Sequence, residues 1–207
     1  MRAEAGTSKR HRILEQVLEV FVENGYVGTT TDQLAAAASA SKQTFYKEFG
    51  DKEGVFTALI AYACDRVDDP FVPLVERMET VETAEQGVKL LAAQMLRSIM
   101  TPYVQQLRRL VIAEAVRFPQ LGRMFWENGF QRLLGSITRC LEVLGRRGLL
   151  AVEDPRVAAH HLSGLLLWIP GNRSMLLAGE LPDEAEAAEI VGAGTAAFLR
   201  AYRPDGT

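Results

Sequence analysis

The chain has few of the residue types that build catalytic and metal sites. Its 207 residues include only two cysteines, Cys64 and Cys140, and three histidines. The cysteines lie far apart and show neither metal-ligand nor redox spacing, so we expect buried thiols in a reduced, cytoplasmic protein. His160 and His161 are adjacent and would point in different directions from a helix, which excludes an i, i+4 metal pair. We expect one of them in the core and the other at the surface or an interface, with no metal and no cofactor.

Long apolar runs and catalytic motifs are also missing. No apolar run, Leu165–Ile169 included, is nearly long enough to cross a membrane. Charged residues interrupt the N-terminal region, so we expect no signal peptide. The sequence has no nucleophile elbow, no glycine-rich phosphate loop and no carboxylate–histidine pair at a usable spacing. Asp154, which lies near His160, is better interpreted as a helix cap. We therefore expect neither an enzyme nor a membrane protein.

The charge balance does not favour general nucleic-acid binding. The chain carries a net charge of −3, and residues 1–52 hold seven basic and seven acidic residues. Nonspecific affinity for DNA should then be modest and sensitive to salt. The one basic cluster, residues 8–12, either follows a DNA backbone or minor groove or belongs to a solvated terminus. Specific binding would need a focused patch together with dimerisation.

Alternation of β-branched residues is weak throughout, so we expect an all-α fold. Asp69–Pro70 predicts a boundary near residues 68–72. Long helices are expected beyond it over about 83–100, from Pro102, and over 121–144, 155–178 and 184–202. Pro170–Gly171 should kink or break the fourth of these.

Two short helices around a tight turn are predicted between Thr30 and Phe49. Thr30 followed by Gln33 is the pattern of a capping box at a helix start. An apolar stripe follows, formed by Leu34, Ala35 and Ala38. The pattern is then interrupted at Ser39–Ser41, which indicates the turn.

The second of these helices is expected to have an apolar inner face and a polar outer face. Ser41 is its predicted N-cap, and Phe45 and Phe49, four residues apart, should point inward together. The outer face carries Lys42, Gln43, Tyr46 and Lys47. This arrangement is typical of a helix-turn-helix, whose second helix enters the major groove of DNA. The alternative is a surface helix hairpin with solvated charges.

The flanking segments favour the DNA-binding interpretation. An amphipathic helix precedes the stretch, and Gly25 suits the left-handed position after its end. Asp51 can cap a further helix that begins at Lys52. Residues 9–60 together resemble the N-terminal domain of the TetR family of bacterial transcriptional repressors. The matching residues are Arg12-Ile13-Leu14, Phe21, Gly25-Tyr26, Thr30, Leu34-Ala35, Ala38, Ser41-Lys42, Thr44-Phe45-Tyr46, Phe49 and Lys52-Glu53. Residues 106–125 resemble the C-terminal domain of the AefR-like branch of that family.

The resemblance implies an all-α protein of about nine helices in three parts. These would be a helix-turn-helix domain over 8–52, a connecting helix over 53–68, and a ligand-binding and dimerisation domain over 69–203. It implies a homodimer that binds a palindromic operator and leaves it when a small effector binds. The last two long helices, about 155–178 and 184–202, would pair with their copies in the partner.

The resemblance also implies which residues touch DNA. Gln43 is the best candidate for a base contact, because its amide can pair with the edge of adenine. The full predicted set is Thr30, Thr31, Ser41, Lys42, Gln43, Thr44, Tyr46, Lys47 and Lys52. For each lysine the alternative is a solvated charge without a partner. Ser39 departs from the family, which usually has glycine there, and a left-handed serine would cost roughly 1–2 kcal/mol.

Bulky residues of the middle helices are candidates for an effector pocket, although such residues more often form plain core. They suggest a hydrophobic or aromatic effector. The candidates are Met95, Ile99, Tyr103, Glu114, Phe118, Phe125, Trp126 and Trp168. Two other functions stay open, a helical ligand-binding module and a transcriptional activator with the same helix-turn-helix.

Overall fold

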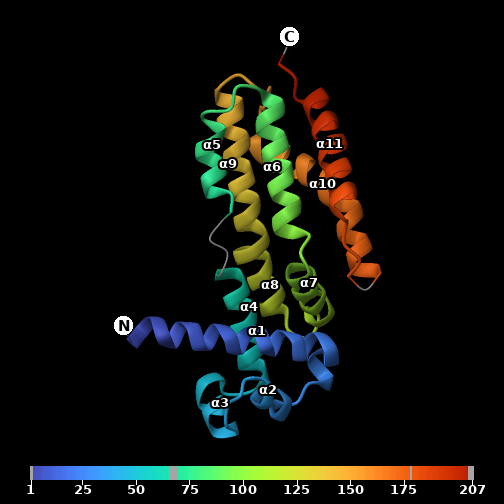
Figure 1. Cartoon of the computed structure of the whole chain (residues 1–207). Helices are drawn as coiled ribbons and strands as arrows, with labels where there is room; N and C mark the ends of the chain where they lie inside the picture. The colour runs from blue at the N-terminus through green and yellow to red at the C-terminus, as the bar shows by residue number, and fades with distance from the viewer. Residues whose placement is uncertain (1, 66–69, 178, 205–207) are drawn as a thin grey trace. The chain divides into compact units, whose positions relative to one another are not determined.

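The computed structural model of the chain describes residues 2–65, 70–177 and 179–204, with the backbone alone described for residues 2–12, 15, 64 and 65. Within these residues the chain forms α-helices and one π-helical segment, η1, but no strand (Figure 1). The all-α prediction is therefore confirmed. In chain order the elements are α1 (Arg2–Gly28), α2 (Thr31–Ala37), α3 (Lys42–Phe49), α4 (Lys52–Asp65), α5 (Val72–Met78), α6 (Ala84–Ile99), α7 (Pro102–Glu114), α8 (Pro119–Met124), η1 (Phe125–Gln131), α9 (Arg132–Arg146), α10 (Pro155–Leu176) and α11 (Glu184–Ala201).

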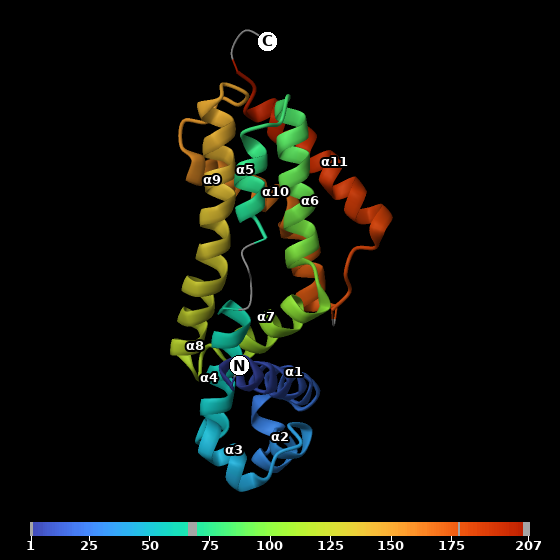
Figure 2. The same cartoon turned by 60° about the vertical axis from the view of Figure 1, so that its left-hand side comes forward.

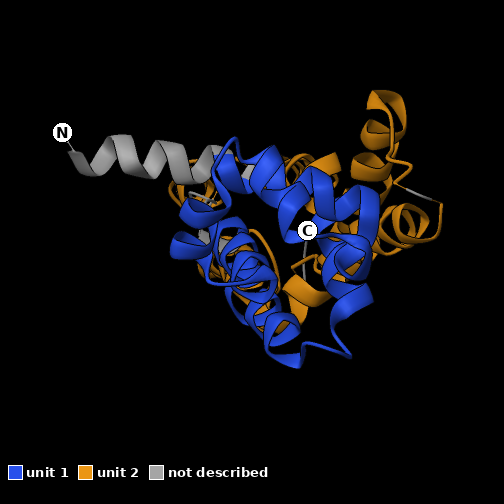
Figure 3. Ribbon diagram, turned by 90° about the horizontal axis from the view of Figure 1, so that it is seen from below, with its two compact units in different colours: residues 1–67, 106–129 blue, residues 68–105, 130–207 orange. Residues whose placement is uncertain are grey.

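The chain divides into two compact units (Figure 3). Unit 1 contains residues 1–67 and 106–129, and unit 2 contains residues 68–105 and 130–207. Residues 106–129 thus cluster with the N-terminal helices, although the family resemblance grouped them with the rest of 69–203. The three ranges predicted from the sequence stay a prediction about functional domains.

Unit 1 is held together by an aromatic core. Tyr26, near the end of α1 and just past a kink at Gly25, stacks on Phe21, which precedes the kink, with 5.8 Å between ring centroids. Phe56 of α4 lies 5.1 Å from the ring of Tyr26, and Phe118, just before α8, lies 4.6 Å from it on another side. Three helices therefore meet around one tyrosine, and the end of α1 is fixed against the start of α4. This contact affects α2 and α3, because both helices lie in the chain between the end of α1 and the start of α4.

Unit 2 is a bundle of α5, α6, α9, α10 and α11. Figure 1 shows the long helices α6 and α9 next to each other, and in the view of Figure 2 α5 lies between them. Gly87 and Gly194 allow two close approaches, because a Cβ at either position would lie within 3 Å of a leucine side chain, Leu144 and Leu166 respectively. The core of the unit includes Leu91, Met95, Ile137, Leu141, Leu162 and Phe198, all with almost no exposed surface.

Several helix ends follow the predicted caps. Asp154 Oδ1 accepts hydrogen bonds from the backbone amides of Arg156 and Val157 at the start of α10. Asp183 accepts one from the amide of Glu186 at the start of α11. Carboxylates at these positions also interact favourably with the helix dipole. The predicted starts of both C-terminal helices are therefore confirmed.

Other expectations from the sequence were wrong. Of the kink or break expected at Pro170–Gly171, the break is excluded, because α10 continues to Leu176. Pro170 cannot donate to the carbonyl four residues earlier, but its ring is buried in unit 2, and packing there offsets the lost bond. His160 and His161 are both exposed, because α10 turns that side away from the core.

Cys140 is buried as expected, whereas the side chain of Cys64 lies outside the described residues.

In the part of the chain that the structure describes, no helix is long and apolar enough to span a bilayer. The candidate basic cluster at residues 8–12 lies outside the described side chains.

Candidate nucleic-acid interface

The first helix of the predicted helix-turn-helix, α2, starts with a complete capping box. The hydroxyl of Thr30 accepts from the amide of Gln33 at 3.2 Å, and the side-chain oxygen of Gln33 accepts from the amide of Thr30 at 2.8 Å. Two backbone donors that the helix itself cannot satisfy are thereby paired. Leu34 and Ala35 are buried beneath the helix. The start of α2 is thus fixed by a local sequence pattern, as predicted.

The turn after α2 is a Schellman motif with serine in the position that normally holds glycine. The amide of Ala40 donates to the carbonyl of Ala35, and the amide of Ser39 donates to that of Ala36, both at 3.0 Å. Ser39 has φ 48°, and it is the one non-glycine residue with positive φ among the described positions. The left-handed turn predicted there is confirmed. It sets the angle at which α3 leaves α2.

The second helix, α3, has the two faces that the sequence predicts. Ser41 caps it by accepting from the amide of Thr44 at 3.1 Å. Phe45 and Phe49 are buried with 5.2 Å between their ring centroids, so they hold α3 against the rest of unit 1. The outer face carries the exposed side chains of Lys42, Gln43, Thr44, Tyr46 and Lys47.

Contacts within this outer face leave some side chains free and engage others. The hydroxyl of Tyr46 lies 2.9 Å from that of Thr31, which joins α3 to the start of α2. Lys42 forms an exposed ion pair with Asp32 at 2.6 Å, and this hydrogen bond raises the pKa of Lys42. Gln43 and Lys47 make no such bond within the described part of the chain. Their polar groups are therefore available to an external partner without breaking a contact.

Lys52 lies where the end of α1 meets the start of α4. Its ammonium donates to the carbonyls of Tyr26 and Thr29, both at 2.8 Å, and approaches that of Val27 at 3.5 Å. It also lies 4.5 Å from the centroid of the Tyr26 ring. An ammonium has three N–H donors, and three carbonyls face it here. In this conformation Lys52 joins two helices, and its predicted phosphate contact would require it to leave them.

Gly54 is a structural residue that the sequence interpretation missed. A Cβ at this position would lie 1.9 Å from the carbonyl oxygen of Phe49, so no other residue fits. The amide of Gly54 donates to Asp51 Oδ1 at 2.8 Å, which caps α4 as predicted. The available signal was an isolated glycine inside a helical pattern, which often marks close packing. Gly54 allows α3 and α4 to turn sharply around Gly50.

Comparison with known sequences identifies the family of this chain. Residues 13–59 match the profile described as bacterial regulatory proteins, tetR family. Residues 86–204, more than half of the chain, match the profile of the AefR-like transcriptional repressor C-terminal domain. The chain belongs to the TetR family. The two resemblances seen in the sequence are confirmed, and the protein is a TetR-family transcriptional regulator with a DNA-binding helix-turn-helix.

Solved TetR-family structures resemble the whole chain. A regulator from Mesorhizobium loti is 37% identical with a TM-score of 0.86, covering 95% of this chain and 97% of that one. A regulator from Agrobacterium tumefaciens is 27% identical with a TM-score of 0.73, covering 94% of each chain. The flavonoid-responsive regulator FrrA is 25% identical with a TM-score of 0.70, covering 97% of this chain and 100% of its own.

Named repressors match over shorter parts of the chain. AcnR of Corynebacterium glutamicum is 42% identical over 53 residues, which are 26% of this chain and 28% of AcnR. DhaR of a Mycobacterium species is 31% identical over 83 residues, which are 36% of this chain and 42% of DhaR. The chain thus matches less than half of the length of either repressor.

The predicted effector residues are divided between the two units of this TetR-family protein. Glu114, Phe118, Phe125 and Trp126 belong to unit 1, whereas Met95, Ile99, Tyr103 and Trp168 belong to unit 2. Phe118 packs in the aromatic core of unit 1, and Met95 is fully buried in the core of unit 2. Trp168 is 69% exposed on α10, and Trp126 is 51% exposed. Neither unit by itself brings these eight residues around one cavity.

Proposed function

We propose that this TetR-family protein is a repressor that binds a palindromic operator as a dimer through the outer face of α3. The observation that carries the proposal is the division of α3 into a buried pair, Phe45 and Phe49, and an exposed polar row. A rigid helix with a polar outer face can lie in the major groove without exposing apolar surface. The names of the matching relatives AcnR and DhaR, both repressors, support repression.

Each polar residue of the outer face has a proposed part in binding. Gln43, near the N-terminus of α3 and without a partner within the described chain, reads a base edge. Lys47 and Tyr46 bind phosphates, and the hydrogen bond between the hydroxyls of Tyr46 and Thr31 orients the Tyr46 ring. Lys42 leaves Asp32 to reach the DNA. The loss of that ion pair is small, since both side chains are more than 60% exposed and exposed pairs contribute about 0–1 kcal/mol.

In addition to capping their helices, Thr30 and Ser41 have a proposed role in binding phosphate. Thr30 and Ser41 already use their hydroxyls as caps, so they offer DNA the backbone amides of helix starts rather than free hydroxyls. Thr44 shares its hydroxyl hydrogen bond with Ser41 at 2.8 Å, which leaves acceptor capacity toward the groove. Lys52 acts in this proposal mainly by fixing the alignment of α1 and α4 through its hydrogen bonds to the carbonyls of Tyr26 and Thr29.

Dimerisation is proposed through α10 and α11. Leu165, Trp168 and Ile169 are spaced i, i+3 and i+4 along α10 and are all exposed. On α11 the small residues Gly192 and Ala193 are exposed as well. A large aromatic and two branched residues on one face are unfavourable in water and typical of an interface. Two copies related by a two-fold axis would present their α3 helices about 34–36 Å apart, one turn of DNA.

Release by a small hydrophobic or aromatic effector is part of the same proposal. Support comes from the AefR-like C-terminal domain and from the likeness to FrrA, whose name describes a flavonoid-responsive regulator. We retain the eight residues named above as candidates for effector contact. An effector would act by favouring one tilt of α4. Moving such an equilibrium from 1:99 to 99:1 takes about 5.5 kcal/mol of differential binding.

The proposal is tested by selecting bound sequences from random duplex DNA with the full-length protein. We expect an inverted repeat with half-sites one helical turn apart. Gln43→Ala should relax preference at one position of each half-site by about 1–3 kcal/mol, whereas Lys47→Ala should weaken all sites alike and lower the salt slope by about 1 per protomer. The control is Gln131→Ala, the same truncation at an exposed glutamine of η1. Selection of no inverted repeat, or equal effects at Gln43 and Gln131, would contradict the proposal.

The direction of regulation is tested separately. The same helix-turn-helix serves a repressor and an activator, so binding does not distinguish them. A reporter placed behind the selected site should be expressed less when the protein is present. Increased expression would indicate the activator alternative and would leave the proposed DNA contacts intact.

A further inference from the structure

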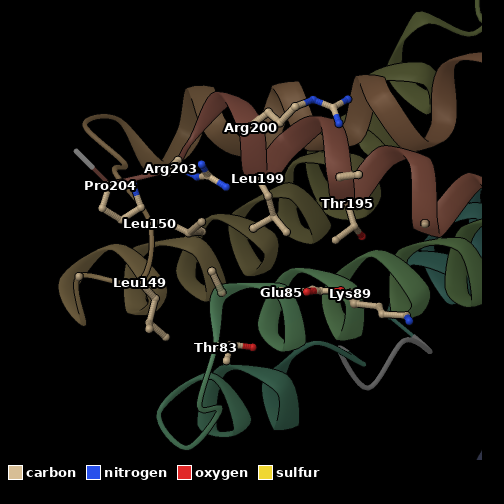
Figure 4. Close-up of a pocket in the computed structure, with 14 residues that line it drawn as sticks. Thr83, Glu85, Lys89, Leu149, Leu150, Thr195, Leu199, Arg200, Arg203 and Pro204 are labelled. Carbon is tan, nitrogen blue, oxygen red and sulfur yellow. The ribbon is translucent and has the colours of Figure 1, made fainter. Parts of the chain in front are cut away.

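Unit 2 contains a cavity that is separate from every residue predicted to bind DNA or effector. It has a volume of about 580 Å³ and lies between the first half of α6, the second half of α11 and the segment after α9 (Figure 4). Volumes of about 300–1,000 Å³ are usual for small-molecule sites. The residues that argue for a ligand are one buried hydroxyl, three leucines and one arginine.

The hydroxyl belongs to Thr195 of α11. Thr195 is only 4% exposed, and its Oγ1 has no hydrogen-bond partner among the described residues. Figure 4 shows its side chain pointing from α11 into the space toward α6. Buried polar groups are nearly always hydrogen-bonded in folded proteins, so an orphaned hydroxyl at the wall of a cavity indicates a missing polar partner.

The cavity wall combines apolar surface with positive charge. Leu149, Leu150 and Leu199 form its apolar part, and Leu199 points across the cavity from α11. The charged residues on the wall are Lys89, Arg200, Arg203 and Glu85. None of the three cations forms an ion pair within the described chain. Figure 4 shows Arg203 at the same end as Leu150, with its guanidinium directed along the cavity, whereas Arg200 points away from it.

We propose that this cavity binds a small amphipathic organic anion, with an apolar body and one carboxylate. The apolar body packs against the three leucines. The carboxylate pairs with Arg203, because a guanidinium offers two parallel donors to a carboxylate. The hydroxyl of Thr195 donates to, or accepts from, a second polar atom of the ligand. This site goes beyond the proposed DNA binding and does not depend on it.

The test is isothermal titration of the full-length protein with 2-naphthoate, and with uncharged 2-naphthamide as the matched ligand. The full-length protein is used because Gly192 and Ala196, which line the cavity, lie on the helix proposed to pair with the partner. Naphthoate should bind with one site per chain, at least about tenfold more tightly than the amide, and less tightly as salt rises.

Variants assign the binding to the cavity. Arg203→Gln and Thr195→Val should each weaken naphthoate binding, the first by about tenfold or more and the second severalfold. Arg97→Gln, which removes an exposed arginine from the other end of α6, is the control and should leave binding unchanged. Thermal unfolding of each variant verifies that it folds. Absence of naphthoate binding up to millimolar concentration, equal binding of the amide, or binding that survives both cavity variants would each overturn the proposal.

Discussion

At the scale of single residues, Ser39 has an unfavourable backbone conformation that its surroundings enforce. Positive φ is costly for any residue with a Cβ, and glycine occupies this position of a Schellman motif in most helices. The two hydrogen bonds of the motif and the burial of Phe45 beyond it hold the turn in place. The backbone of Ser39 is therefore strained, and the hydrogen bonds and packing around the turn keep it in this conformation.

Replacing this serine should consequently stabilise the protein. We expect Ser39→Gly to raise the free energy of unfolding of unit 1 by about 0.5–1 kcal/mol, since the strain relieved exceeds the entropy that glycine adds to the unfolded chain. Urea denaturation followed by circular dichroism measures the change. Ser98→Gly, in the last turn of α6 where φ is negative, should instead destabilise unit 2 by a similar amount. Equal destabilisation by both changes would show that Ser39 is not strained.

Residue-scale features were predictable from the sequence where the interaction is local. The caps at Thr30, Ser41 and Asp154 depend on side chains within three residues of the amides they bind, so their pattern is visible in the sequence. The three carbonyls around Lys52 come from residues more than twenty positions earlier. No periodicity encodes such a contact, because it exists only after α1 and α4 have packed.

At the scale of helices, the contact of Lys52 decides how α1 and α4 support the helix-turn-helix between them. The carbonyls of Tyr26 and Thr29 belong to the end of α1 and the residue before the cap of α2. These carbonyls lack some of the N–H partners that they would have inside a helix, because α1 ends here. Lys52, at the first position of α4, supplies the missing donors. A lysine at this position therefore stabilises the alignment of α3 even without touching DNA.

The substitution Lys52→Met separates this role from a phosphate contact. It keeps the length and the packing of the side chain but removes the donors. We expect a loss of about 1–2 kcal/mol in the free energy of unfolding of unit 1, the lower part of the range for hydrogen bonds from a charged group, because Lys52 is partly exposed. Operator affinity should fall while its salt slope stays the same. Both are measured on the full-length protein, by urea denaturation and by titration of operator DNA at several salt concentrations.

Lys47→Met is the matched control for that experiment. Lys47 is exposed on α3 and has no partner in the described chain, so its loss should leave stability unchanged and lower the salt slope by about 1 per protomer. If Lys52→Met behaves like Lys47→Met instead, Lys52 binds phosphate and its contacts to the α1 carbonyls are dispensable.

The helices that sequence periodicity located least well are those shaped by packing. The stretch expected as one helix over 121–144 consists of α8, η1 and α9, because a π-helical segment over Phe125–Gln131 interrupts the regular hydrogen bonding. Such segments have no established sequence signal and are common at functional positions. At Pro170 the sequence predicts an interruption instead, but α10 continues through this proline because its ring is buried in the core.

At the scale of the whole molecule, the sequence predicted the all-α class and the N-terminal DNA-binding part, but not the division into units. Residues 106–129 join unit 1 because Phe118 packs on Tyr26, more than ninety positions earlier in the chain. Apolar spacing shows that a helix has a buried face, but it does not show which helix covers that face. For the same reason the spacing of apolar residues placed Phe118 among the effector candidates. It also placed Trp168 beside Met95, although Trp168 is exposed and Met95 is in the core.

The exposed row on α10 leads to a prediction about assembly. Ile169 is 70% exposed between Leu165 and Trp168 on the face proposed to meet the partner. A two-fold interface contains every substitution twice, so Ile169→Glu would place two carboxylates in an apolar contact. Burying charge without a partner costs several kcal/mol, and we expect the dissociation constant of the dimer to rise by about 100-fold or more. Analytical ultracentrifugation over a range of concentrations measures this change.

The control for this experiment is Ile112→Glu, because Ile112 is also exposed, at 55%, but lies on α7 outside the proposed interface. It should leave the dimer intact. The Ile169→Glu protein should keep its helical circular dichroism and lose affinity for a full operator, while binding to a single half-site changes little. That combination follows because each α3 is folded and aligned within its own unit 1, whereas the spacing of two α3 helices depends on the partner. A dimer that survives Ile169→Glu but dissociates with Ile112→Glu would move the interface from α10 to α7.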